Sequence, residues 1–285
     1  MIARVDSLAI NRVQTLARRA KRGKGAETGR QALEAISRVA GGPVDDSPSP
    51  EHIEAVAAAL EQLWDRSTGR IRPSKRLRRA VIDQFHRIYY GAKGTTWHNT
   101  YYRGVKIWKC PLDVWLYQEI MHEVQPDLII ETGTAFGGSG YFLADMCETM
   151  GRGRVVSIDI KSRTGGLVHP RLTFLIGSST DPALKKEVLA MLPEGGKTLI
   201  ILDSDHSQRH VLDEMRLWHD VVSTGSYLIV EDSNINGHPV DTTYGPGPWE
   251  AIDEFMKKNG DFEIDESKHK FLMTLNPRGY LKKVK

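Results

Sequence analysis

The chain has 285 residues, 40% hydrophobic and 26% charged, which is typical of a globular protein with a sizeable core. A formal net charge of +3 is too small to indicate a nucleic-acid or membrane partner, and two cysteines without a CxxC pattern argue against a disulfide framework or a zinc ribbon. No apolar run reaches the roughly 20 residues that cross a bilayer, and the first residues lack a secretory signal, so we expect a cytoplasmic protein.

The first third of the chain differs in composition from the rest. Residues 1–40 are rich in Ala, Leu, Arg and Gln and predict helix, residues 41–50 predict a linker, and residues 51–64 predict a second helix behind Pro50. Residues 69–102 are mixed, aromatic and basic. We therefore expect residues 1–97 to form a mainly helical extension or cap, ahead of a domain over residues 98–285.

Two basic clusters lie in this extension. They comprise Arg18, Arg19, Lys21, Arg22 and Lys24, and then Arg70, Arg72, Lys75, Arg76, Arg78 and Arg79. Solvated helix faces explain them without a nucleic-acid partner, and the first cluster has no interleaved aromatic residues for base stacking. RNA is kept as an alternative substrate, and it predicts steep salt dependence of binding.

Helices and strands alternate from Pro111 onward. The expected helices cover residues 111–124, 140–150, 183–191, 211–222 and 249–258, and the expected strands cover residues 128–130, 155–160, 172–176, 198–202 and 227–230. The tail loses helical spacing and predicts strands over residues 262–264, 271–275 and 280–284. The pattern indicates an α/β fold with a doubly wound, Rossmann-like, mostly parallel sheet and an antiparallel C-terminal strand.

Acidic residues directly follow two of the predicted strands. Asp203 and Asp205 follow residues 198–202, and Glu231 and Asp232 follow residues 227–230. Ligands of open α/β sheets bind at the carboxyl ends of the strands, and clustered carboxylates repel one another unless a cation is present. Oxygen ligands favour Mg²⁺ or Mn²⁺ over zinc or copper. Asp203 is preferred to Asp205 as a ligand because it follows the buried strand directly.

A glycine-rich loop follows the strand at residues 128–130. Its sequence, Glu-Thr-Gly-Thr-Ala-Phe-Gly-Gly-Ser over residues 131–139, lets the backbone approach a ligand closely, and the acid at the strand end suits a cationic ligand. Asp159 ends the next strand, where a carboxylate can bind a ribose diol. Ser178 and Ser179 follow the third strand and could face an adenine.

Four motifs in order resemble the cephalosporin hydroxylase/rhamnosyl O-methyltransferase family. They are Glu-Thr-Gly-Thr-x-x-Gly-Gly-Ser (131–139), Ser-Ile-Asp-Ile (157–160), Leu-Asp-Ser-Asp-His (202–206) and Val-Glu-Asp-Ser-Asn-Ile-Asn-Gly (230–237). The resemblance covers about residues 98–285. It implies a class I methyltransferase that uses S-adenosylmethionine and a divalent cation, with relatives that act on sugars and assemble into oligomers.

The resemblance also assigns roles to individual residues. The cofactor site comprises Glu131, Gly133, Thr134, Gly137, Ser139, Asp159, Ser178, Ser179 and Asp203, and the metal ligands are Asp203, Glu231 and Asp232. His206 matches the general base of the sugar-modifying members, so Asp203 and His206 are the catalytic pair; a role of His206 in capping the following helix is the alternative. Catechol methyltransferases have Asp, Asp and Asn at the metal positions, so Glu231 and Asp232 disfavour a catechol substrate.

These observations lead to one expected function. We predict a Mg²⁺- or Mn²⁺-dependent O-methyltransferase acting on a sugar hydroxyl of a glycoside, glycolipid or oligosaccharide, as a homo-oligomer. The alternative is methylation of another hydroxylated small molecule or of RNA. An iron oxygenase needs two histidines and one carboxylate on a barrel and does not fit. Loss of catalysis has no support, because every expected acidic residue and His206 are present.

Overall fold

The computed structural model describes residues 64–65, 70–71 and 75–285. The helix expected over residues 1–40, the linker and the first basic cluster lie outside these residues, as does the helix expected over residues 51–64 except for its last residue. That residue, Trp64, begins strand β1 (Trp64–Asp65), which pairs antiparallel with β2 (Arg70–Ile71).

The chain forms two compact units, Met1–Gln84 and Phe85–Lys285. Strands β1 and β2 and the start of helix α4 (Lys75–Gly91) belong to the first, and the rest of α4 belongs to the second. The second unit contains every residue that the sequence assigns to chemistry. The domain boundary predicted at residue 97 stays a prediction.

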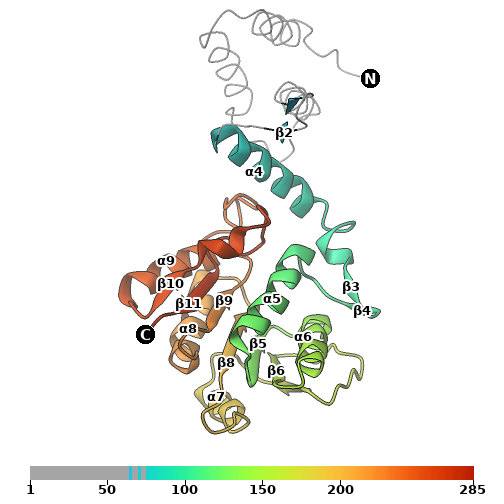
Figure 1. The fold of residues 1–285 in the computed structure, drawn as a ribbon, viewed down its shortest axis with the longest axis vertical. Helices are drawn as coiled ribbons and strands as arrows, with labels where there is room; N and C mark the ends of the chain where they lie inside the picture. The colour runs from blue at the N-terminus through green and yellow to red at the C-terminus, as the bar shows by residue number, and fades with distance from the viewer. Residues whose placement is uncertain (1–63, 66–69, 72–74) are drawn as a thin grey trace, which may run out of the picture. The chain divides into compact units, whose positions relative to one another are not determined.

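A seven-stranded mixed sheet forms the centre of the second unit (Figure 1). Its strands are β5 (Leu128–Thr132), β6 (Arg154–Asp159), β7 (Leu172–Ile176), β8 (Thr198–Leu202), β9 (Tyr227–Val230), β10 (Phe262–Ile264) and β11 (Tyr280–Lys283). The order is β10-β11-β9-β8-β5-β6-β7, and only β11 runs antiparallel to its neighbours. The predicted doubly wound sheet with an antiparallel C-terminal strand is confirmed.

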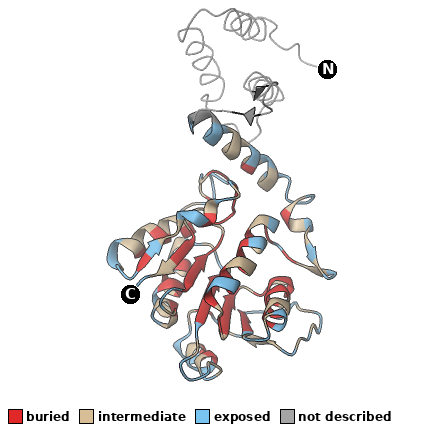
Figure 2. Cartoon of the chain, viewed as in Figure 1, coloured by how far each residue is buried: buried red, intermediate tan, exposed pale blue. Residues whose placement is uncertain are grey.

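Helices cover both faces of this sheet. They are α5 (Pro111–Val124), α6 (Gly138–Thr149), α7 (Pro182–Leu189), α8 (Gln208–Trp218) and α9 (Pro248–Lys258). Successive strand residues point to opposite faces, so Ile129 and Ile201 pack with α5 and α6, whereas Ile130 and Ile200 pack with α7, α8 and α9. Burial on both faces explains why the central strands are continuous apolar runs, buried along their length in Figure 2.

The chain order of the strands positions the site. β5 pairs in parallel with β6 on one side and with β8 on the other, because the chain proceeds outward to β7 and then returns across β5. The loops after β5 and β8 consequently diverge at one edge of the sheet. This reversal is where open α/β sheets bind their ligands.

Two short segments differ from the sequence expectation. Residues 271–275 are not a strand. The Asp113 carboxylate accepts hydrogen bonds from the Thr274 hydroxyl at 2.5 Å and from the Leu275 N–H at 2.9 Å, so a side chain replaces a strand partner here. Within the mixed segment of residues 69–102, α4 is an amphipathic helix that was not separately predicted. It is followed by a 3-10 turn, η1 (Trp97–Asn99), and a two-stranded ribbon of β3 (Tyr101–Tyr102) and β4 (Val105–Lys106).

The remaining short elements are η2 (His219–Val221), which ends the helix expected over residues 211–222, and η3 (Glu266–His269). None of the helices in the described ranges is both long and apolar enough to span a membrane.

Candidate active site

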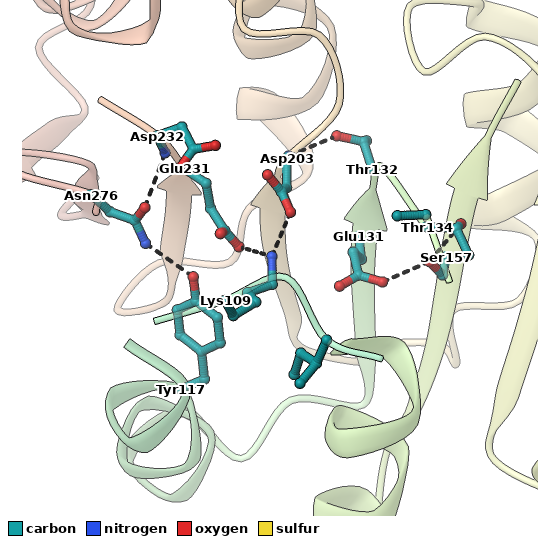
Figure 3. A network of polar contacts seen from close by, with 12 residues as sticks. Lys109, Tyr117, Glu131, Thr132, Thr134, Ser157, Asp203, Glu231, Asp232 and Asn276 are labelled. Carbon is teal, nitrogen blue, oxygen red and sulfur yellow. Dashed lines mark hydrogen bonds and ion pairs between the residues drawn. The ribbon is translucent and has the colours of Figure 1, made fainter. Parts of the chain in front are cut away.

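Three neighbouring strands bring carboxylates to one edge of the sheet. Glu131 is the penultimate residue of β5, Asp203 directly follows β8, and Glu231 directly follows β9. The pairings of Thr132 with Leu202 and of Leu202 with Val230 align these strand ends. Figure 3 shows the three side chains on adjacent strands. The sequence analysis expected acidic residues after β8 and β9 at one edge and treated Glu131 separately, as part of the cofactor loop.

Gly133 allows the loop after β5 to lie directly on the backbone of Asp203. Its φ is +85°, and a Cβ atom built there would lie 1.7 Å from the Asp203 carbonyl oxygen. The Asp203 N–H donates to the Thr132 carbonyl at 3.1 Å, and this hydrogen bond holds the two chain segments close together next to Gly133. A side chain at position 133 is therefore excluded by both backbone conformation and space.

Replacing Gly133 with alanine is expected to lower the free energy of unfolding by about 3 kcal/mol or more, because the methyl group meets backbone that cannot rotate away. Gly151 is the matched control: its φ is +71°, but a Cβ atom there meets nothing within 4 Å. Gly151→Ala should therefore cost only about 1 kcal/mol of backbone strain. Urea unfolding of both variants measures the difference; equal losses would contradict the close approach.

Glu231 and Asp232 are consecutive, yet both side chains reach the site. Neighbouring residues of an extended strand point to opposite faces, but Asp232 has a φ of +52°, which turns the chain at this point. The Asp232 N–H donates to Asn276 Oδ1 at 3.0 Å, and Asn276 Nδ2 donates to the Tyr117 hydroxyl at 3.0 Å. Buried Asn276 and Tyr117 thus hold an unfavourable backbone conformation in place.

Lys109 is a site residue that sequence reasoning missed. Its Nζ lies 2.5 Å from Asp203 Oδ2 and 2.6 Å from Glu231 Oε1, and its side chain is 3% exposed (Figure 3). Burial alone would lower the pKa of Lys109, but the surrounding carboxylates outweigh it and hold that pKa above its ordinary value. The only sequence signal was a lysine inside the otherwise apolar stretch Ile107–Cys110.

The carboxylates themselves are poorly solvated. Burial raises the pKa values of Asp203 and Glu231, and repulsion between the buried carboxylates adds to the effect, while Lys109 opposes it. Burial likewise raises the pKa of Glu131. Each of these carboxylates is therefore protonated more easily than usual unless a cation lies beside it.

His206 faces the same cluster from the loop between β8 and α8. Its Nε2 lies 3.1 Å from Asp232 Oδ2 and 3.8 Å from Asp203 Oδ1. Burial lowers the pKa of His206, but Asp232 and Asp203 reverse this and leave it above the ordinary value of 6.5. Ligand atoms of Asp203, His206 and Asp232 all lie within 4.8 Å of one another, so these three can share one cation.

Asp205 lies apart from this cluster. It is exposed, and its Oδ1 accepts the Ser207 N–H at 2.8 Å at the start of α8. The side chain is thus used as a local turn acceptor. Of the two aspartates after β8, only Asp203 contacts the other acidic residues of the site.

The predicted cofactor residues line the glycine-rich loop. Gly133, Thr134 and Ser139 border a narrow pocket with Asp203, and the segment Lys106–Lys109 forms its other wall. Gly137, with a φ of +84°, is the residue from which α6 begins. Thr134 Oγ1 lies 2.8 Å from Ser157 Oγ, which donates to Glu131 Oε2 at 2.6 Å.

Glu131 retains one unused acceptor. Its side chain is fully buried, and within the described part of the chain its Oε1 has no hydrogen-bond partner. An orphaned buried carboxylate oxygen is costly unless a ligand supplies a donor. A cationic or amino-bearing ligand beside the loop meets this requirement.

The residues predicted to hold a nucleoside lie further along the edge. Asp159 accepts N–H bonds from Ala135 and Lys161, each at 3.0 Å, and so braces the loop. Ser178 is exposed, whereas Ser179 is buried with its Oγ 3.2 Å from His210 Nε2. Exposed Ile160 and Ile176 flank Asp159 and supply an apolar surface that the sequence analysis did not single out.

A larger cavity, of about 460 Å³, lies at the opposite edge of the sheet. It borders Asp127 and Arg171, at the amino ends of β5 and β7. Asp127 binds Arg152 and the Lys197 N–H, and Arg171 binds the Gly153 carbonyl. The protein itself supplies hydrogen-bond partners for these polar groups. The carboxyl edge, where Glu131 Oε1 is unpaired among the described residues, is therefore the better candidate for a ligand site.

A mostly parallel, doubly wound sheet with a glycine turn after one strand and acidic residues after its neighbours is the arrangement of a class I methyltransferase, a fold of the kind that binds nucleotide-like ligands at this edge. The family model described as Rhamnosyl O-methyltransferase/CmcI matches residues 94–284. The chain belongs to this family, as its motifs predicted. The prediction that it is an S-adenosylmethionine-dependent O-methyltransferase is confirmed.

Several known proteins are similar to the chain. The rhamnosyl O-methyltransferase of Mycobacterium bovis (strain BCG / Pasteur 1173P2) is 42% identical over 236 residues, covering 80% of this chain and 91% of that protein. The rhamnosyl O-methyltransferase of Mycobacterium leprae (strain TN) is 39% identical over 208 residues, covering 71% and 90%.

Among solved structures, the CmcI-N160 apo-structure gives a TM-score of 0.51 at 21% identity, covering 66% of this chain and 77% of that one. The structure named cmcI-D160 Mg-SAM gives 0.50 at 22% identity, covering 66% and 78%. These likenesses support the fold.

Proposed function

We propose that this protein transfers the methyl group of S-adenosylmethionine to a hydroxyl of a rhamnosyl residue in a glycoside or glycolipid, with the help of Mg²⁺ or Mn²⁺. The observation that carries the proposal is the cluster of Asp203, Asp232 and His206 in a chain 42% identical to a rhamnosyl O-methyltransferase. The structure named cmcI-D160 Mg-SAM supports the same choice of cofactor and metal, because by its name it is a protein of this fold with Mg and SAM.

The residues present fit both groups. Asp203, Glu231 and Asp232 offer the carboxylate oxygens that Mg²⁺ and Mn²⁺ prefer, and His206 lies beside them with its Nε2 left for the acceptor hydroxyl. Glu131 offers a buried, unpaired oxygen beside the glycine-rich loop, which suits the positively charged end of the cofactor. Gly133, Thr134, Gly137, Ser139, Asp159, Ser178 and Ser179 are the proposed cofactor contacts.

His206 is proposed to act as the general base. Its Nε2 faces the carboxylates, so this nitrogen would take the proton of the acceptor hydroxyl. Asp232 Oδ2, 3.1 Å from the same nitrogen, would stabilise the imidazolium once the proton has been taken. The divalent cation, when bound, supplies Lewis-acid polarisation that makes the hydroxyl more acidic. The remaining acceleration would come from holding the acceptor oxygen against the methyl group.

A direct assay tests the proposal. The purified protein is incubated with S-adenosylmethionine, Mg²⁺ and p-nitrophenyl α-L-rhamnoside, and the product is followed by mass spectrometry. We expect one methyl group on the sugar, and loss of the reaction on adding a chelator. The mannoside and a catechol serve as comparison acceptors; methylation of the catechol alone would overturn the sugar assignment.

Location and assembly are parts of the same proposal. We expect a cytoplasmic homo-oligomer, as the sequence and the family resemblance indicated. Light scattering of the purified full chain measures the assembly directly, and a monomer at all concentrations would contradict it.

A further inference from the structure

Lys109 is held rigidly at the centre of the acidic cluster. It lies between β4 and α5, next to Cys110, from which α5 begins, and Pro111 at the first helical position. The adjacent Trp108 ring stacks on His98 with 4.6 Å between centroids. The lysine backbone is therefore fixed by neighbours on both sides, and its ammonium reaches the strand ends of β8 and β9 from a third segment.

The ammonium uses one oxygen from each of two carboxylates. It binds Asp203 Oδ2 and Glu231 Oε1, whereas the other oxygen of Asp203, Oδ1, faces His206. Asp232 Oδ2 also faces His206. An ammonium and a second cation can thus bind Asp203 at the same time, one on each oxygen.

The charges of this arrangement match a divalent ion. Asp203, Glu231 and Asp232 carry three negative charges when ionised, and Lys109 neutralises one of them. Glu131, which also acts on Lys109, is counted with the positively charged end of the cofactor, and His206 is counted as neutral. Two negative charges then remain for one doubly charged cation. Buried charge that is not balanced in this way is strongly unfavourable.

We propose that Lys109 is a positioning residue that fixes the carboxylates of Asp203 and Glu231 for cation binding and sets the charge of the site to that of a divalent ion. The inference rests on the proposed function, because it deepens the role of the same metal site. Lys109 does not touch the reacting atoms. It acts through the two carboxylates, as outer partners of metal ligands commonly do.

The test measures ion binding without the reaction. Mn²⁺ and Tb³⁺ are titrated separately into the full-length wild type, Lys109→Met and Lys109→Arg, by calorimetry and by terbium luminescence. We expect Lys109→Met to bind Mn²⁺ about 10–100-fold more weakly, since loss of an outer partner typically has this effect. Its preference for Tb³⁺ over Mn²⁺ should rise on the order of tenfold, because the carboxylates lack one compensating charge. Lys109→Arg should keep the wild-type preference.

A matched control is a second buried, ion-paired lysine away from the site. Lys268 Nζ lies 2.7 Å from Glu123 Oε1, and its side chain is 7% exposed. Lys268→Met should bind both ions as the wild type does, and near-ultraviolet circular dichroism should show native packing in all variants. A higher preference of Lys109→Met for Tb³⁺ over Mn²⁺, relative to the wild type, is a response that loss of a merely structural lysine would not produce.

The outcomes separate the two levels of the proposal. Lys109→Met that binds Mn²⁺ as tightly as the wild type, or tighter, overturns the positioning role and leaves the metal-dependent function standing. An unchanged preference between the two ions overturns the charge-setting role. Absence of Mn²⁺ binding by the wild type overturns both this inference and the metal-dependent mechanism.

Discussion

Exchanging Asp203 for asparagine is expected to lower the rate of methyl transfer by about 10³-fold or more, because a Lewis-acid site contributes several kcal/mol to the barrier. Asp203 is the one carboxylate in the described residues that contacts both the Lys109 ammonium and His206. The asparagine has the same shape but carries no charge, so the fold should persist. Calorimetry with Mn²⁺ and the rhamnoside assay together measure the loss.

Asp205→Asn is the control for this experiment. Asp205 also follows β8, but it is exposed, and its hydrogen bonds go to the backbone and side chain of Ser207. It should retain Mn²⁺ binding and near wild-type activity. If Asp205→Asn lost the metal and Asp203→Asn kept it, the ligand assignment after β8 would be reversed.

Replacing His206 with glutamine is expected to lower kcat by about 10²–10⁴-fold, the usual contribution of a general base. Only the neutral imidazole can accept a proton, so wild-type activity should rise with pH as His206 deprotonates. The variant should lose this acid limb of the profile as well as the rate. A variant with a lower rate but an unchanged profile would assign the limb to another group.

The pKa of His206 also predicts an effect on stability in the absence of metal. Asp232 and Asp203 raise the folded-state pKa above the ordinary 6.5, so protonated His206 stabilises the fold. This stabilisation is complete below pH 6.5 and disappears as the pH rises through the folded-state pKa. Thermal unfolding of the metal-free protein should show this dependence. Asp203 and Glu231, whose pKa values are also raised, act in the same direction, so His206→Gln should weaken the dependence and not remove it.

His210→Gln distinguishes a base from a histidine of the helix. His210 lies one turn beyond His206, where its Nε2 contacts Ser204 and Ser179 at 3.0 and 3.2 Å. These contacts join the loop to α8 and point to packing. His210→Gln should therefore keep the pH profile of the wild type, with at most a loss of stability.

The sheet was predictable because its central strands are unbroken apolar runs. Residues 172–176, 198–202 and 227–230 form strands with the bounds expected from sequence. Parallel strands expose their carboxyl ends on one edge, so the proximity of Asp203 and Glu231 also followed from chain order. Their individual roles came from the family resemblance.

Features that depend on a single distant contact were not predictable. Lys109 reaches Asp203 across 94 positions of sequence, and nothing in its neighbourhood specifies that partner. The segment 271–275 has strand-like composition, but its hydrogen-bond donors pair with the Asp113 carboxylate on α5 and not with a neighbouring strand. Local patterns specify the elements, whereas such side-chain contacts are decided by where those elements come to lie.

The dependence of Asp232 on Asn276 has a consequence for the order in which the protein is made. Asn276 holds the Asp232 backbone from a segment translated 44 residues later, just ahead of the strand that inserts between β9 and β10. A nascent chain that ends before residue 276 already contains every proposed metal ligand. It still lacks the Asn276 side chain that holds the backbone of Asp232. Affinity for the divalent ion should therefore emerge late in synthesis, after the β5–β9 strands have had the opportunity to pair.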